Sequence, residues 1–175
     1  SPTQFRTPTL PQFVQDALQA TGLSPSRLVI EITEGVMMDA SPAAVTNANT
    51  LRAMGISISM DDFGTGYSSL SNLRAFPFDK IKIDGSFIKS VNTNEQAATI
   101  VRAVLGLGRG LGLPVLAEGV ETPAELAFLQ SELCNEVQGY LVGRPAPITT
   151  FTALTHEGGT PATADEVQVR LAKSA

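Results

Sequence analysis

The sequence predicts an α/β fold in which helices cover a parallel β-sheet. Helix-like and strand-like segments alternate about five times along the chain, and the connections between them are short. The strand-like segments are brief runs rich in Ile, Val and Leu, as expected for strands that are buried on both faces. Such alternation produces a parallel sheet, because each helix carries the chain back to begin the next strand in the same direction. The pattern fits both an open, doubly wound sheet and a closed barrel.

Composition and charge narrow the class of protein. The chain has 175 residues and a mass of 18.4 kDa, with 43% hydrophobic side chains, which suits one globular domain with a substantial core. Its formal net charge of -5 argues against binding of a nucleic-acid polymer, which needs clustered Lys and Arg. The single cysteine, Cys134, excludes an intramolecular disulfide framework and a cysteine-based zinc site. The sequence shows neither a long apolar run nor a charged leader, so we expect no membrane contact and a cytoplasmic location.

The first half of the chain contains two pairs of a helix and a strand. Apolar residues recur at helical spacing over residues 10–20, and Gly22 follows where a left-handed helix end is usual. Residues 28–33 then form a β-branched run that predicts a buried strand. A second helix is predicted over residues 42–54 and a second strand over residues 56–61, after which a glycine-rich loop begins.

The second half continues this alternation and ends in a tail. Residues beyond about position 155 are rich in Thr, Ala, Gly and Pro, which is atypical of a packed core. We therefore expect a domain over residues 1–154 and a C-terminal tail over residues 155–175, with one helix over residues 165–173. The other predicted elements are a strand over 81–84, a helix over 95–111, a strand over 114–118, a helix over 123–133 and a strand over 136–140.

Each predicted strand carries a charged or amide side chain at or near its carboxyl end, although buried parallel strands are otherwise apolar. This end of the sheet is where α/β folds place their chemistry. Charges in a low-dielectric interior are costly, so these acids must share protons, pair with the lysine or hold divalent cations. Capping of the next helix explains any single carboxylate equally well, but the repetition over five strands favours a functional site. The residues are Glu31, Asp61, Asp62, Lys82, Asp84, Glu118 and Gln138.

The segment from Asp61 to Ser69 is the most informative stretch of the chain. Two adjacent carboxylates, Asp61 and Asp62, precede a loop with Gly64 and Gly66, whose freedom would let both acids reach one point. Paired acids suit oxygen-liganded Mg²⁺ or Mn²⁺, and one acid can bridge two ions. The loop would also suit a phosphate at a helix start, but it lacks the lysine and the spacing of a Walker loop.

Lys82 lies between two isoleucines of a predicted buried strand, where its ammonium group cannot easily reach bulk water. One possible role is that of a counterion to the nearby acids. A second role, which does not exclude the first, is to orient or help deprotonate an attacking water molecule. A divalent-metal aldolase or isomerase, with a Schiff base on Lys82, is a less favoured alternative. The only histidine, His156, lies in the tail, which leaves little support for acid-base catalysis by histidine.

In these residues and their order, the chain resembles the EAL-domain family of bacterial cyclic di-GMP phosphodiesterases. The matching segments occur in the family's order and cover roughly residues 1–150. Together they are highly specific, although the last two would be weak alone. They are Glu31-Ile32-Thr33-Glu34, Asp61-Asp62-Phe63-Gly64-Thr65-Gly66-Tyr67-Ser68-Ser69-Leu70, Lys82-Ile83-Asp84, Ala117-Glu118-Gly119-Val120-Glu121, and Gln138-Gly139-Tyr140 with Gly143-Arg144-Pro145.

The resemblance implies a TIM-like (β/α) barrel that hydrolyses one phosphodiester bond of cyclic di-GMP to give the linear dinucleotide pGpG. It implies Mg²⁺ or Mn²⁺ as the cofactor, with two ions. Because Ca²⁺ has a looser coordination geometry, we expect it to occupy the site and inhibit. The implied roles are metal ligation by Glu31, Asp61, Asp62 and Glu118, catalysis by Lys82, Glu118, Asp61 and Asp62, substrate contacts by Gln138, Gly139 and Pro145, and loop support by Glu34, Thr65 and Glu121.

The resemblance also implies segments beyond the printed sequence. In the family, the Glu-Ala-Leu stretch with its metal-ligating Glu and an Asn ligand both precede the position of Ser1, so we expect an upstream segment that carries them. A TIM barrel takes about 250 residues, so this chain is expected to lack the N-terminal strands and helices of the barrel. Upstream sensor or diguanylate cyclase domains and a homodimer are further expectations. The alternative function is a catalytically inactive cyclic di-GMP receptor that signals through a partner interface.

Overall fold

The structure is a computed structural model that describes residues 2–38, 41–64 and 76–151. The strands are β1 (Val29–Thr33), β2 (Ser57–Phe63), β3 (Lys80–Ile83), β4 (Val115–Ala117) and β5 (Glu136–Val137). The helices are α1 (Pro2–Phe5), α2 (Leu10–Thr21), α3 (Glu34–Met38), α4 (Pro42–Ala53), α6 (Gly85–Ile88), α7 (Glu95–Leu111) and α8 (Pro123–Ser131), with 3₁₀ turns η1 (Pro25–Arg27) and η2 (Ile148–Phe151).

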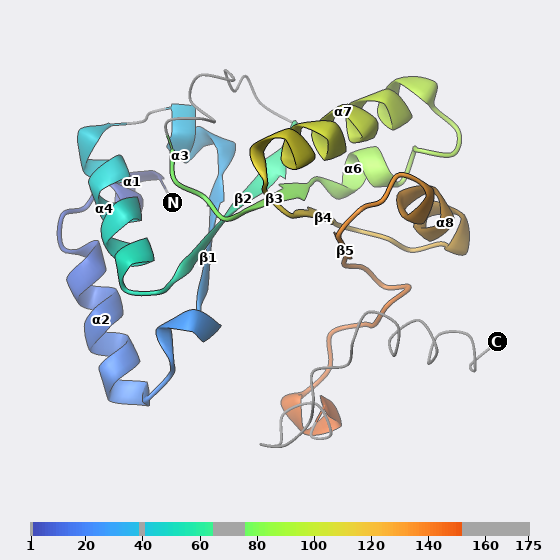
Figure 1. Cartoon of the computed structure of the whole chain (residues 1–175). Helices are drawn as coiled ribbons and strands as arrows, with labels where there is room; N and C mark the ends of the chain where they lie inside the picture. Colours follow the sequence, from blue (N-terminus) through green and yellow to red (C-terminus); the bar gives the residue numbers. More distant parts are fainter. Residues whose placement is uncertain (1, 39–40, 65–75, 152–175) are drawn as a thin grey trace.

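The five strands form one parallel sheet in the order β1-β2-β3-β4-β5, which confirms the predicted α/β class. Each strand therefore pairs with the strand that precedes it in the chain. A doubly wound sheet reverses its strand order at a switch point, whereas a barrel keeps the order consecutive. Figure 1 shows the strands fanned across the centre, with α2 and α4 beside one end of the sheet and α7 and α8 beside the other. The consecutive order favours the barrel over the doubly wound alternative.

Local signals fix where the longer helices begin and end. α2 ends at Gly22, whose backbone is left-handed with φ 68°, as its sequence position predicts. α7 begins at Asn94, whose side chain accepts hydrogen bonds from two backbone N–H groups, and it ends at Gly112 with φ 69°. α8 begins with a capping box in which Thr122 and Glu125 satisfy each other's backbone N–H groups. These helices are therefore set by residues that the sequence alone makes visible.

The core lies between the sheet and its helices. α4 packs against β2, and α7 packs against β3 and β4. Gly108 of α7 lies so close to Val115 of β4 that a Cβ at this position would overlap the valine side chain, so glycine permits the close approach. The sheet residues that face the helices are fully buried and apolar. They include Ile58, Met60, Ile81, Ile83, Val115 and Ala117.

Several details differ from the sequence-based expectations. The predicted strand over residues 136–140 is too long, because β5 ends at Val137 and the chain turns at Gly139, whose carbonyl accepts two N–H groups from Val142 and Gly143. The short helices α1, α3 and α6 were not predicted, since four or five residues carry too little periodicity to be recognised. The tail over residues 155–175 and its expected helix lie outside the described residues. Among the described helices, none is long and apolar enough to cross a membrane.

Candidate active site

The carboxylates of Asp61 and Asp62 leave β2 at an irregularity of the strand. The pairing of β2 with β3 shifts register between Met60 and Phe63, and Asp62 has a left-handed backbone with φ 55°. In a regular strand adjacent side chains point to opposite faces, but a bulge with a left-handed residue redirects one of them. The sequence analysis expected the glycines after Asp62 to let both acids reach one point. The change in backbone direction instead occurs at Asp62 itself, within β2, which continues through Phe63.

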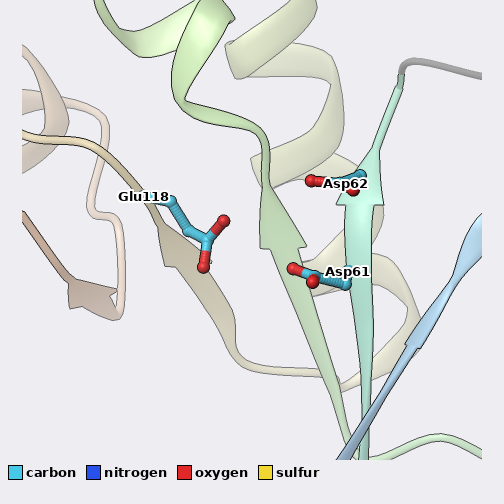
Figure 2. Close-up of side chains that lie close together, drawn as sticks. All are labelled: Asp61, Asp62 and Glu118. Carbon is cyan, nitrogen blue, oxygen red and sulfur yellow. The ribbon is translucent and has the colours of Figure 1, made fainter.

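Three carboxylates converge at the carboxyl ends of the strands. One oxygen from each of Asp61, Asp62 and Glu118 lies within 4.8 Å of the other two. Figure 2 shows Asp61 and Asp62 on β2 and Glu118 just beyond β4 pointing toward one another across β3. All three residues are partly buried. The strand order brings together acids that are far apart in the sequence and creates an all-oxygen set of donor atoms.

Lys82 lies at the centre of this site, and it is only 5% exposed. Its Nζ lies 2.8 Å from Glu31 Oε1, 2.8 Å from Asp61 Oδ1 and 2.6 Å from Glu118 Oε1. The expected ion pairing between Lys82 and the strand-end acids is therefore observed. Glu31 is outside the close group of three acids, and its side chain is 51% exposed because β1 is an end strand of the described sheet. The ammonium group links acids from both sides of β3.

The environment of Lys82 favours its protonated form. Burial alone would lower the pKa of the ammonium group, but hydrogen bonds to Asp61, Glu118 and Glu31 outweigh burial and raise its pKa. A buried lysine that is surrounded by carboxylates stays charged at neutral pH. It donates hydrogen bonds and does not accept a proton.

Asp84, which the sequence analysis places at a strand end without giving it a role, lies beside Asp62. Burial and the charges of Asp61 and Asp84 raise the pKa of Asp62, with a further contribution from a hydrogen bond to Asp84 and an opposing one from Lys82. Asp84 also caps α6, since it accepts a hydrogen bond from the Ser86 backbone N–H at 3.0 Å and another from the Ser86 hydroxyl. Asp84 follows the last residue of β3, so it lies at the same carboxyl edge of the sheet as the other acids.

The donor set fits a divalent cation. Carboxylate oxygens are the ligands that Mg²⁺, Mn²⁺ and Ca²⁺ prefer. The pKa of Asp62 is raised by burial first and then by the neighbouring carboxylates, and this surplus of negative charge is one that a cation would neutralise. This surplus comes from five carboxylates around one ammonium group. They are Glu31, Asp61, Asp62, Asp84 and Glu118, around Lys82.

Gln138 and Gly139 follow β5 and are tied to the segment after β4. The Gln138 N–H donates to the Ala117 carbonyl at 2.8 Å, and the Gln138 carbonyl accepts the Val120 N–H at 3.0 Å. A Cβ on Gly139 would overlap the backbone of Val120, so this close approach by itself requires glycine. Gln138 is exposed. The substrate contacts expected of these two residues stay predictions.

The remaining expected site residues make no ion pair or hydrogen bond with the three acids that any described contact shows, or they lie outside the described residues. Glu34 is buried at the start of α3. Glu121 pairs with Lys89 at 3.0 Å, and both side chains are exposed. Pro145 is exposed beyond β5. Thr65 and the loop that Glu34 is expected to support lie outside the described residues, so these roles also stay predictions.

Known proteins resemble this chain over most of its length. The family model of the EAL domain matches residues 1–145. An uncharacterized signaling protein of Caulobacter vibrioides is 52% identical over 170 residues, which are 97% of this chain and 21% of that protein. The bifunctional diguanylate cyclase/cyclic di-GMP phosphodiesterase MucR of Pseudomonas aeruginosa is 45% identical over 153 residues, 87% of this chain and 22% of MucR. The chain thus spans about a fifth of the length of these curated relatives.

Solved structures show the same fold. The structure described as "PaMucR Phosphodiesterase, c-di-GMP complex" superposes with a TM-score of 0.82 at 44% identity, over 86% of this chain and 61% of that one. Klebsiella pneumoniae BlrP1, solved with cy-diGMP and either calcium or manganese, gives a TM-score of 0.75 at 36% identity, over 82% of this chain and 36% of that one. The TIM-like barrel is thereby confirmed, and the five described strands form one arc of it. The chain belongs to the EAL domain family.

Proposed function

We propose that this chain hydrolyses one phosphodiester bond of cyclic di-GMP and releases the linear dinucleotide pGpG, with divalent cations as cofactors. The observation that carries the proposal is the convergence of Glu31, Asp61 and Glu118 on Lys82. The name of MucR and the cyclic di-GMP complexes of the structural neighbours support this substrate. In the reaction a water oxygen bonds to phosphorus, the bond from phosphorus to one ribose oxygen breaks, and that oxygen leaves with a proton as a hydroxyl group.

Asp61, Asp62 and Glu118 would hold Mg²⁺ or Mn²⁺, with Glu31 as a further ligand by analogy with the family. Their oxygens within 4.8 Å of one another and the surplus negative charge support this assignment. When bound, the cation supplies positive charge that polarises the phosphate and eases proton loss from water. Two ions are proposed, because Asp61 and Asp62 are adjacent and one carboxylate can bridge a pair of ions. The manganese and calcium complexes of BlrP1 support the use of divalent metals.

Lys82 would act as a hydrogen-bond donor in this reaction. Its three carboxylate contacts hold acids from different strands at fixed positions, and its raised pKa keeps it protonated. A protonated lysine orients the attacking water and stabilises negative charge on the phosphate oxygens. The same raised pKa opposes the aldolase alternative, because a Schiff base forms only from a neutral amine.

The test of the proposal is incubation of the purified protein with cyclic di-GMP and Mg²⁺ or Mn²⁺, with products separated by liquid chromatography. Formation of pGpG that stops when a chelator is added is the expected result. Binding of cyclic di-GMP without any linear product would reject the enzyme and support the receptor alternative. Ca²⁺ in place of Mg²⁺ should permit binding but allow little hydrolysis, because its looser coordination positions water poorly.

Two lysines of β3 form a matched pair for the catalytic test. Lys82→Ala should reduce kcat strongly with a smaller effect on substrate affinity. Lys80 lies two residues earlier on the same strand and pairs with Glu136 at 2.6 Å, outside the acid cluster, so Lys80→Ala should leave kcat nearly unchanged. Equal losses of kcat in the two variants would contradict a specific role of Lys82 in catalysis.

Further domains and a homodimer are proposed as partners of this chain. The matched region covers about a fifth of MucR, which is named as a diguanylate cyclase as well as a phosphodiesterase. A sensor or cyclase domain in the same polypeptide is therefore proposed. Sedimentation analysis with and without cyclic di-GMP would test the homodimer.

A further inference from the structure

Ser59 of β2 is a buried polar residue that the proposed function does not use. It is 1% exposed, and its hydroxyl makes no hydrogen bond to any described group of the protein. Its register places it opposite Glu31 on β1 and opposite Lys80 on β3. Because side chains alternate along a strand, Ser59 lies on the same face as Asp61. The hydroxyl is therefore directed toward the side of the sheet that carries the acid cluster.

A buried hydroxyl without a partner is costly, so nearly all buried polar groups in folded proteins have a protein or water partner. Ser59 lies one layer of side chains nearer to the amino ends of the strands than Asp61. The groups around it on this face are charged, since Glu31 and Asp61 each contact Lys82 at 2.8 Å. An internal water molecule is stable where two to four such groups can bind it. Ser59 and Glu31, which is opposite it in register, supply polar groups of this kind.

We propose that Ser59 is a positioning residue: it holds an internal water molecule below Lys82, and this water donates a hydrogen bond to the Glu31 carboxylate. Glu31 needs such support, because its side chain is half exposed and Lys82 is its only ion-pair partner among the described residues. A second contact restricts its rotamers and aims it at the cation site. This inference rests on the proposed function, which makes Glu31 a metal ligand.

The test uses Ser59→Ala, which removes one oxygen and leaves the strand intact. Mn²⁺ alone is titrated into the protein by calorimetry, and we expect its affinity to fall about 10-fold, as is usual when a supporting contact of a metal ligand is lost. Thermal unfolding without metal should shift down by about 2–4 °C, because the water and Glu31 lose a partner. An unchanged Mn²⁺ affinity would overturn the proposal. So would a rise in Tm, which is the result for a hydroxyl that is merely unsatisfied.

Ser57→Ala is the matched control. Ser57 lies on the same strand and the same face, two residues before Ser59, and it is partly exposed. Neither Mn²⁺ affinity nor Tm should change in this variant. Failure of the wild-type protein to bind Mn²⁺ would overturn the proposed metal site and the role of Ser59 together. A wild-type protein that binds Mn²⁺ and forms pGpG, with an equally tight Ser59→Ala variant, would overturn only the role of Ser59.

Discussion

Alternate residues of the central strands face opposite environments. Ile58 and Met60 of β2 and Ile81 of β3 point toward the helices and are completely buried. Asp61 and Lys82 directly follow Met60 and Ile81 in these strands, point toward the other face and form an ion pair with each other. The first face gains stability from apolar burial, and the second holds charges that are only partly neutralised. One strand therefore supplies both the stability of the fold and the chemistry of the site, through residues that are immediate neighbours in sequence.

The largest effect should come from the charged face. Asp61→Asn removes a carboxylate that is both a proposed metal ligand and a partner of Lys82, so we expect phosphodiesterase activity to fall at least about 10³-fold. The Tm should stay within a few degrees, because Lys82 keeps two other carboxylates and repulsion with Asp62 is relieved. Initial rates and thermal unfolding measure the two effects. Asp16→Asn, on the exposed face of α2, is the control and should be neutral in both.

The apolar face should show the reverse behaviour. Ile81→Ala leaves a cavity in the core, and we expect the free energy of unfolding to fall by about 2–5 kcal/mol. The activity of the molecules that remain folded should be close to normal. Urea unfolding followed by circular dichroism measures the change. Val29→Ala on β1, where the side chain is exposed, should cost less than about 1 kcal/mol, and a loss as large as that of Ile81→Ala would contradict the distinction between the faces.

A substitution at Gly139 distinguishes between a structural role and a substrate-binding role for this residue. Because its Cβ would overlap the Val120 backbone, Gly139→Ala should lower the free energy of unfolding by about 1–3 kcal/mol even without substrate. Gly143→Ala is the control, since a Cβ at Gly143 meets no described atom within 4 Å. If Gly139→Ala changed KM but left the urea midpoint untouched, the residue would be a substrate contact and its packing unimportant.

The smallest expected effect concerns the reactivity of the Cys134 thiol. Cys134, next to β5, has its thiol 3.3 Å from the Glu136 carbonyl, and burial raises its pKa despite opposing backbone hydrogen bonds. Less thiolate is present at a given pH, so alkylation by iodoacetamide at pH 8 should be at least about tenfold slower than in urea. Since the folded state holds this proton more tightly, stability should decline slightly as pH rises through the ordinary thiol pKa. Equally fast labelling in the folded and unfolded protein would contradict a closed core here.

Much of the fold follows from local sequence signals. The helix ends at Gly22 and Gly112 and the capping box at Thr122 are encoded by residues whose preferences are strong. The consecutive strand order was not determined by the pattern of elements, because alternation alone is the same in an open sheet and in a barrel. The early end of β5 depends on the packing of Gly139 against Val120, a contact between segments distant in sequence.

The sequence predicted which residues form the site better than it predicted how they are arranged. Acids at strand ends identified Asp61, Asp62 and Glu118, and the resemblance to a family assigned their roles. Asp84 was recognised at a strand end, but its hydrogen bond with Asp62 was not predicted, because the sequence does not show how the backbone turns at Asp62, where φ is 55°. The exposure of Glu31 depends on its place in an end strand of the described sheet, which the sequence of β1 alone does not specify.

Pairing of each strand with the strand before it also sets the order in which the site can assemble during synthesis. A nascent chain can add one helix and one strand at a time, with contacts that stay short in sequence. Lys82 meets Asp61 when β3 docks, but Glu118 arrives only after α7 has folded and β4 has paired. Until then the ammonium group lacks one of its three carboxylates, so the acid cluster is incomplete until β4 has docked.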